Sequence, residues 1–387
     1  MTAMALRVLN VNDFLDLKRG GGTAERTFQL SRHLARAGIQ CDVLSIDADT
    51  LDQSRKAAVS PAQLTLFSCL LRRFNVPRVR WAALNELVAR ADIIHMMGHW
   101  SVLNAAVYLA ARKQRKPYIL SPAGALPVYG RSRWLKHLFN ALVGNAMVRN
   151  ATGWIAITEM ECKNLVSYGV APERVVTIPN GVDEDDFPSV DLSGFRWRMG
   201  LPAEVPIILF MGRLAPIKGP DLLLEAFIRV REELPFHHLV FVGPDGGMRE
   251  ELQKTVSFFG VAPWVHFLGY LEAADKSAAY RMADLLVVPS RQEAMSIVAV
   301  EAGFCETPVL VTDQCGFHDI VSVGGCMEVT ATVGGLVEGL KCILSGSLSA
   351  SEQRSQLKNF MVDRYSWAQL APKYIAYFQT ILSGLPR

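Results

Sequence analysis

Short apolar runs alternate with amphipathic stretches along most of the chain, and this alternation limits the folds that the chain can adopt. The runs are rich in Val, Ile and Leu, as is typical of strands buried on both faces of a parallel sheet. We predict strands at 6–11, 41–46, 92–96, 117–120, 153–157, 174–178, 207–211, 238–242, 265–268, 284–288 and 308–312. Strands that alternate with helices in both halves of a chain predict two parallel α/β sheets.

A chain of 387 residues is too long for one ordinary domain, so we expect two domains. Residues 184–206 are rich in Pro, Gly and charge and have weak periodicity, which is typical of a connection between domains. We therefore predict a first domain at 1–183, a second domain at 184–364 and a closing helix at 365–387.

The net charge of +3 conceals an asymmetry between the two halves. Residues 1–180 contain 23 Lys and Arg against 12 Asp and Glu, and the remainder contains 17 against 25. A basic first half predicts an anionic partner, such as a membrane surface or a phosphorylated lipid. The alternative is a domain that is basic without such a partner. We do not expect a nucleic-acid partner.

Two basic stretches with interleaved aromatic residues, 72–81 and 131–149, favour docking on an anionic membrane surface. The second stretch is predicted as a basic amphipathic helix from 132 to 148; the alternative is a helix packed on the sheet with a solvated basic face. No apolar run is long enough to span a bilayer, and the start does not resemble a signal peptide. The seven cysteines lack CxxC spacing, which indicates free thiols in a reducing compartment. We expect a cytoplasmic protein, peripheral on the inner face of the membrane.

Two carboxylates, Glu293 and Glu301, flank a predicted helix start near Ser296, directly after the strand at 284–288. On one helix they would lie about 12 Å apart along its axis, too far to share one small group. With Glu293 in the loop and Glu301 in the helix, both face a ligand at the helix N-terminus. Its free N–H groups and dipole favour a phosphate. The alternative is two glutamates without a ligand.

Two further loops have the composition of ligand-binding segments. Arg213 and Lys218 flank a tight loop before a helix, where two cations would hold a diphosphate and offset its charge as it departs. Glycines 20–22 separate a strand from a helix and allow a phosphate or sugar to approach the backbone. The triplet matches neither GxGxxG nor a Walker loop, and a plain flexible loop is the alternative.

His99 follows the carboxyl end of the predicted strand at 92–96, the end at which doubly wound sheets bind ligands. His95 alternates with apolar neighbours inside the strand and is interpreted as a core residue.

Several motifs stand in order over most of the chain. They are Gly20-Gly21-Gly22, Pro179-Asn180-Gly181-Val182-Asp183, Gly212-Arg213-Leu214 with Lys218-Gly219, Gly269-Tyr270, Pro289-Ser290 with Glu293 and Glu301-Ala302, and Thr307-Pro308-Val309. The set resembles the retaining nucleotide-sugar glycosyltransferases of family 4, also called group 1. The resemblance implies the GT-B fold, with two Rossmann-like domains facing a central cleft and a C-terminal helix that crosses back to the first domain.

The resemblance also implies roles for matching residues. Arg213 and Lys218 would bind the donor diphosphate and Glu293 the transferred sugar, and these three are the predicted catalytic residues. The predicted donor-binding residues are Gly21, Gly22, Gly243, Tyr270, Met295, Ser296, Ile297 and Glu301, of which Glu301 would meet the ribose and Gly243 and Tyr270 the base. His99 and Asn180 are placed on the acceptor or sugar side.

By this resemblance the reaction is a same-face transfer from a nucleoside-diphosphate sugar to a glycan or lipid-linked acceptor, in polysaccharide or glycolipid synthesis. No metal or other cofactor is expected, because Arg213 and Lys218 take its place. The alternatives are a nucleotide-sugar-binding protein without transfer, and a nucleotide-sugar epimerase. The sequence departs from the family pattern at Met97, where relatives have a second histidine, and at 294–296, where Ala-Met-Ser replaces the usual Gly-Phe-Gly.

Overall fold

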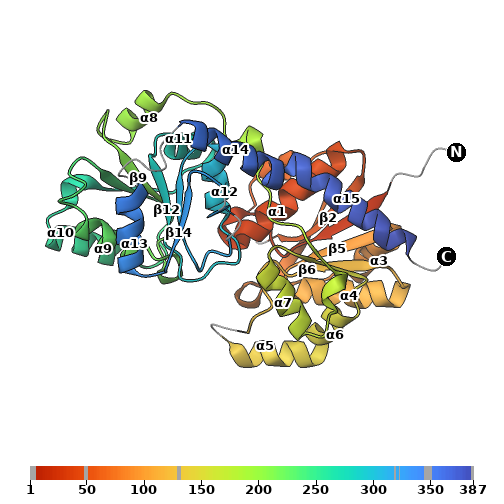
Figure 1. Ribbon diagram of the computed structural model, residues 1–387. Helices are drawn as coiled ribbons and strands as arrows, with labels where there is room; N and C mark the ends of the chain where they lie inside the picture. Colours follow the sequence, from red (N-terminus) through yellow and green to blue (C-terminus); the bar gives the residue numbers. More distant parts are fainter. Residues whose placement is uncertain are drawn as a thin grey trace. The chain divides into compact units, whose positions relative to one another are not determined.

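The computed structural model describes residues 6–47, 51–128, 132–317, 320–321, 323–343 and 351–384. The chain divides into two compact units (Figure 1). Unit 1 comprises Met1–Gly181 and Trp367–Arg387, and unit 2 comprises Val182–Ser366. Each unit is described by itself.

Unit 1 is built on a sheet with the strand order β4-β3-β2-β1-β5-β6-β7-β8. Its strands are β1 (Arg7–Val11), β2 (Gln40–Asp47), β3 (Gln63–Leu71), β4 (Val76–Pro77), β5 (Ile93–Met97), β6 (Tyr118–Ser121), β7 (Gly153–Ala156) and β8 (Val175–Thr177). Only the β3–β4 pair among these strands is antiparallel. The direction in which strands are added reverses between β1 and β5, which are neighbours in the sheet.

Helices cover both faces of this sheet (Figure 1). They are α1 (Leu17–Arg36), α2 (Gln53–Ala58), α3 (Trp81–Arg90), α4 (Val102–Gln114), α5 (Arg133–Phe139), α6 (Asn145–Arg149), α7 (Glu159–Ser167) and α15 (Trp367–Ser383). Apolar residues of α1 and α15 pack on one face, and those of α3, α4, α6 and α7 pack on the other. The C-terminal helix therefore returns to the first unit, as predicted.

Unit 2 has a parallel sheet with the order β11-β10-β9-β12-β13-β14. Its strands are β9 (Ile207–Met211), β10 (His238–Val242), β11 (Val265–Gly269), β12 (Leu285–Val288), β13 (Val309–Thr312) and β14 (Cys326–Val329). Its helices are α8 (Leu192–Arg198), α9 (Pro220–Arg229), α10 (Arg249–Phe258), α11 (Ala273–Arg281), α12 (Ile297–Phe304), α13 (Val333–Cys342) and α14 (Ser351–Tyr365). Both units thus have the predicted parallel α/β architecture.

The structure differs from the sequence prediction at several elements. Strands β3 and β14 were not predicted, because most of their residues are exposed or only partly buried and the sequence pattern there is weak. The glycine triplet, expected as a loop, lies inside α1, which begins at Leu17 and has a kink at Gly21, with φ of 53°. The early start has a local cause, since the Asp16 carboxylate accepts a hydrogen bond from Arg19 N at 2.9 Å. The predicted helix at 132–148 is formed by α5, a π-helical turn and α6; Arg131 lies outside the described residues.

A buried arginine holds α1, α15 and the end of the first half together. Arg26 of α1 is 2% exposed. Its Nε donates to the Tyr374 hydroxyl of α15 at 3.0 Å, Nη1 to Asn180 Oδ1 at 2.8 Å and Nη2 to the Ile178 carbonyl at 2.9 Å. A guanidinium in the core is tolerated when its donors are satisfied in this way.

The predictions on membrane-spanning segments and on cysteines can be compared with the structure directly. In the part of the chain that the structure describes, no helix has the length and apolar character needed to cross a membrane. All seven cysteines are free, and Cys41, Cys305, Cys315 and Cys326 are buried. The prediction of free thiols is confirmed.

We expect Arg26→Met to lower the free energy of unfolding by about 3 kcal/mol, because two buried acceptors and one partly buried acceptor in unit 1 lose their donor. Arg36 is exposed on the same helix, so Arg36→Met should lower the free energy of unfolding by less than about 1 kcal/mol. Urea denaturation followed by circular dichroism measures both. Equal stability of the two variants would show that the network does not hold α15 in place.

Candidate active site

The loop after β9 positions Lys218 against the loop after β12. Gly219 has φ of 66°, and a Cβ at this residue would lie 2.0 Å from the Pro289 carbonyl oxygen. Only glycine permits this close approach with this backbone conformation. The loop that contains Lys218 is therefore in contact with the loop that contains Glu293.

Lys218 and Glu293 form an ion pair in this contact. Lys218 Nζ lies 2.7 Å from Glu293 Oε1, and the Ser290 hydroxyl donates to Glu293 Oε2 at 3.0 Å. Both carboxylate oxygens are thus engaged, and the Glu293 side chain is 12% exposed. The structure brings together two predicted catalytic residues that lie 75 positions apart in the chain. It adds Ser290, to which the sequence prediction gave no role.

Arg291 fastens the same two loops. Its guanidinium donates to both carboxylate oxygens of Asp221 in α9, at 2.8 and 2.5 Å, and to the Pro216 carbonyl at 2.6 Å. Arg291 N also donates to the Ile217 carbonyl at 2.8 Å. Burial alone would raise the pKa of Asp221, but the hydrogen bonds and charge of Arg291 hold it below its ordinary value. The sequence alone did not indicate this bidentate pair.

Arg213 lies in the same loop as Lys218 but makes different contacts. Its side chain is exposed and has no ion-pair partner among the residues that the structure describes. Its carbonyl accepts a hydrogen bond from Ala215 N at 2.8 Å. The loop therefore presents one cation that is paired, Lys218, and one that is exposed to solvent.

The predicted helix start after Glu293 is α12, with Ser296 as its N-cap residue. Ser296 is fully buried, and its hydroxyl has no hydrogen-bond partner in the described structure. Met295 is buried and Ile297 is partly buried. The first turn of α12 thus presents its N–H groups beside an unsatisfied hydroxyl, which is the environment that anions favour.

Glu301, in the second turn of α12, faces α11. Lys276 Nζ donates to its Oε1 at 2.7 Å, and the Tyr280 hydroxyl donates to its Oε2 at 2.6 Å. Burial and the Glu301 carboxylate raise the pKa of Tyr280 well above its ordinary value. Glu301 is 8% exposed, and its predicted contact with a ribose stays a prediction. Lys276 and Tyr280 were not predicted as part of the site.

Two other predicted donor-binding residues lie at neighbouring strand ends. A Cβ at Gly243 would lie 1.9 Å from the Gly212 carbonyl oxygen, so the loops after β10 and β9 pack against each other. Tyr270, just after β11, is 48% exposed. Both lie at the carboxyl edge of the sheet, as does the Lys218 loop.

In unit 1, the glycine segment lies at the carboxyl edge of its own sheet. A Cβ at Gly20 would lie 3.0 Å from the Phe14 carbonyl oxygen, whereas no atom lies within 4 Å of a Cβ built at Gly21 or Gly22. Gly21 and Gly22 are therefore the open pair. Asn180, predicted on the acceptor or sugar side, is a partner of the buried Arg26.

His99 lies in an aromatic cage. It is 1% exposed, and its Nε2 is 2.8 Å from Asn140 Oδ1. The rings of Trp100, Phe139 and Tyr168 surround it with centroid distances of 4.5, 5.7 and 5.5 Å. Burial lowers its pKa to about 4, so the imidazole is neutral at pH 7. His99 packs in the core of unit 1 in this structure, and its contact with an acceptor stays a prediction.

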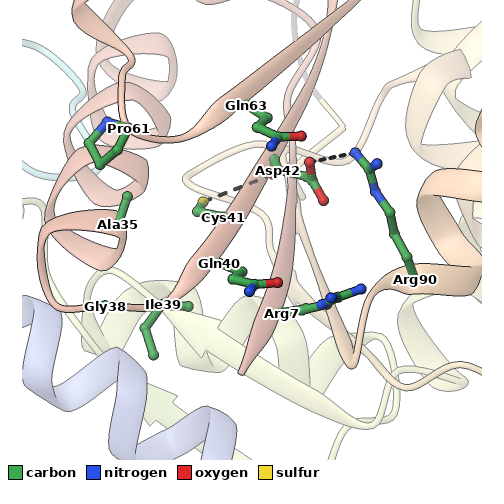
Figure 2. A pocket seen from close by; sticks show the side chains of 10 residues that line it. All are labelled: Arg7, Ala35, Gly38, Ile39, Gln40, Cys41, Asp42, Pro61, Gln63 and Arg90. Carbon is green, nitrogen blue, oxygen red and sulfur yellow. Dashed lines mark hydrogen bonds and ion pairs between the residues drawn. The ribbon is translucent and has the colours of Figure 1, made fainter. Parts of the chain in front are cut away.

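A hollow of about 420 Å³ lies at the opposite edge of the unit 1 sheet (Figure 2). Its walls include Arg7, Gln40 and Gln63, each at the amino end of its strand. Arg90 Nη2 lies 2.6 Å from Asp42 Oδ1 in its wall. The hollow is therefore remote from the carboxyl edge, where the glycine segment lies. Among the described residues, no group of three or more His, Cys, Asp and Glu side chains has an arrangement that could hold a metal.

Comparison with protein-family models matches both halves of the chain. Residues 20–186 match the model described as Glycosyltransferase Family 4, and residues 194–360 match the model described as Glycosyl transferases group 1. The fold and these matches define a glycosyltransferase with the GT-B fold. The chain therefore contains a family 4 glycosyltransferase domain in its first half and a group 1 glycosyltransferase domain in its second half, and the resemblance seen in the sequence is confirmed.

Individual proteins are similar over most of the chain. A D-inositol 3-phosphate glycosyltransferase of Geodermatophilus obscurus is 29% identical over 79% of this chain and 73% of its own length. Its Mycobacterium tuberculosis counterpart is 25% identical over 87% and 69%. Among solved structures, Anabaena HepE with UDP and glucose has a TM-score of 0.78 at 18% identity, covering 97% of this chain and all of HepE. WaaG, a lipopolysaccharide glycosyltransferase, has a TM-score of 0.66 at 19% identity, covering 96% and 99%. These structures establish the GT-B fold.

Proposed function

We propose that this protein is a retaining glycosyltransferase that moves a sugar from a nucleoside-diphosphate sugar to a hydroxyl of a glycan or lipid-linked acceptor. The observation that carries the proposal is the ion pair between Lys218 and Glu293, whose atoms lie 2.7 Å apart. Glu293 lies shortly before the N-terminus of α12, and Lys218 lies in the same loop as the exposed Arg213. The relatives named D-inositol 3-phosphate glycosyltransferase and the HepE complexes with UDP and UDP-glucose support this class of donor and reaction.

The proposed transfer proceeds on one face of the sugar. The acceptor oxygen forms a bond to the anomeric carbon as the bond from that carbon to the diphosphate breaks, and the acceptor proton passes to the departing phosphate oxygen. Lys218 and Arg213 stabilise the charge that develops on the diphosphate. Because these cations supply the charge, the proposed reaction needs no metal or other cofactor. Glu293 holds Lys218 in position and accepts a hydrogen bond from the transferred sugar.

The N-terminus of α12 contributes to the same proposed site. In the proposed site, the backbone N–H groups of Met295, Ser296 and Ile297 donate to a phosphate or a sugar hydroxyl. The buried Ser296 hydroxyl supplies one further polar group. Glu301 orients the ribose from the second turn, with Lys276 and Tyr280 fixing its carboxylate. We propose that the base binds beside Gly243 and Tyr270.

We expect Lys218→Ala and Arg213→Ala each to lower kcat by roughly 10²–10³-fold, because each removes a cation from the leaving group. The assay measures nucleotide release with a panel of UDP-glucose, UDP-galactose and GDP-mannose, in the presence of D-inositol 3-phosphate or an alkyl glucoside. A thermal-shift screen first selects the donor, since a bound donor stabilises the protein by mass action.

Lys341→Ala is the matched control, because Lys341 forms only an exposed pair with Glu233 in the described structure. This variant should retain full turnover. Near-normal turnover in both Lys218→Ala and Arg213→Ala would contradict the proposal. Donor binding without nucleotide release would indicate a binding protein, and conversion of the donor without an acceptor would indicate an epimerase.

The acceptor class is proposed from an exposed stripe on unit 1. Trp134, Leu138 and Leu142 are 68%, 46% and 75% exposed and recur every four residues along α5 and the turn after it. Arg133 and His137 are exposed beside them. Large apolar side chains beside basic residues are typical of a helix that lies in the headgroup region of an anionic membrane. We therefore propose that the protein acts at the inner face of a membrane, in polysaccharide or glycolipid synthesis.

We expect the protein to co-sediment with vesicles of phosphatidylglycerol, but not of phosphatidylcholine, at low salt. Replacing both Trp134 and Leu142 by Glu should abolish this binding. Trp197→Glu is the control, because Trp197 is 83% exposed on α8 of unit 2. Failure of the unaltered protein to bind phosphatidylglycerol, or equal binding by the double variant, would contradict the membrane role.

A further inference from the structure

The topology of unit 1 marks one position on its sheet for a ligand. Strand addition reverses between β1 and β5, and open α/β sheets bind ligands outside the carboxyl ends of the strands at such a reversal. We therefore expect acceptor contacts from the residues that follow these two strands. Residues 12–16 follow β1, and residues 98–101 follow β5.

Asp13 joins these two segments. The Ser101 hydroxyl, at the start of α4, donates to Asp13 Oδ1 at 2.5 Å. The Asp13 carbonyl accepts hydrogen bonds from Ser45 Oγ at 3.1 Å and from Ile46 N at 3.0 Å. Both its backbone and its carboxyl group are thus held by neighbouring strand ends. A group fixed in this way loses little further freedom when it binds a ligand.

The Asp13 carboxyl retains unused hydrogen-bonding capacity. Its Oδ2 has no partner among the described residues. Fastening the loop to Ser101 needs only one acceptor oxygen, which an uncharged amide supplies at a lower desolvation cost. Burial raises the pKa of Asp13 to about 6, against the effect of the Ser101 hydrogen bond. A carboxylate kept in such surroundings gains most from an added donor.

Asp13 is also close to the glycine segment. The Phe14 carbonyl, one residue on, lies 3.0 Å from the Cβ position of Gly20, and Gly21 and Gly22 leave open space beyond it. His99 lies on the same loop as Ser101 but is enclosed by aromatic rings. Of the two side chains, Asp13 is the one with an oxygen left to bind a ligand.

We propose that the Asp13 carboxylate binds a hydroxyl group of a polyhydroxylated acceptor and positions that acceptor for transfer. The inference rests on the proposed glycosyltransferase function and adds its acceptor subsite. Asp13 accepts a hydrogen bond and keeps no proton: the acceptor oxygen bonds to the anomeric carbon, and its proton leaves on the diphosphate.

The test compares Asp13→Asn and Asp13→Ala with Ser101→Ala. Asp13→Ala and Ser101→Ala remove the loop contact, whereas Asp13→Asn keeps its acceptor oxygen. Only the two Asp13 variants remove the carboxylate. With the donor selected by thermal shift, and D-inositol 3-phosphate or an alkyl glucoside as acceptor, Asp13→Asn should lower kcat/KM for the acceptor by roughly 10- to 100-fold. The Kd for the nucleoside diphosphate, measured by calorimetry, should change less than about twofold. Ser101→Ala should retain most of the acceptor kcat/KM.

Two results would overturn the inference. One is an Asp13→Asn variant whose acceptor kcat/KM equals that of the unaltered protein. The other is a Ser101→Ala variant that loses as much as Asp13→Ala, since this would assign Asp13 a purely structural role. If the unaltered protein transfers no sugar from any donor to either acceptor, the proposed function itself fails, and the inference fails with it.

Discussion

The buried guanidinium of Arg26 is the constraint on which unit 1 depends. It joins α1, the segment at 178–180 and Tyr374 of α15 by hydrogen bonds of 2.8 to 3.0 Å. A charge in the core is expensive unless all its donors are met, so the end of the chain must return to the first unit to meet them. The glycine segment lies in the first turns of the same helix, α1, and its position is therefore fixed by residues far along the sequence.

In unit 2, charged side chains closer to the surface are likewise held by ion pairs and hydrogen bonds. Lys218 is held by Glu293, Glu293 by Ser290, and the two loops by the Arg291–Asp221 pair. Each cation or carboxylate is thus oriented before a ligand arrives, which is how preorganised charge lowers the barrier of a reaction. Arg213 differs because its side chain is exposed. In the proposed reaction, this exposed cation follows the departing diphosphate. The match of residues 194–360 to the group 1 glycosyltransferase model agrees with this arrangement.

The sequence predicted the parallel sheets, the return of α15 and the start of α12, because buried strands and a helix start have strong local signals. It did not predict β3 or β14, most of whose residues are exposed or half-buried. It also failed to show that Glu293 pairs with Lys218, or that Asn180 accepts a hydrogen bond from Arg26. Both contacts join residues at least 75 positions apart. The sequence also did not predict the aromatic cage around His99, because Tyr168 lies far from His99 in the sequence. Patterns along a chain report periodicity; they do not report which distant side chains meet.

The most direct test of the account is calorimetric binding of UDP, GDP and ADP, each compared with its monophosphate, in buffer with EDTA. If Lys218 and Arg213 hold the donor diphosphate without a metal, the preferred diphosphate should bind about 100-fold more tightly than its monophosphate. That difference should vanish when both residues are replaced by Ala. Equal affinity for the diphosphate and the monophosphate, or an unchanged difference in the double variant, would contradict the account.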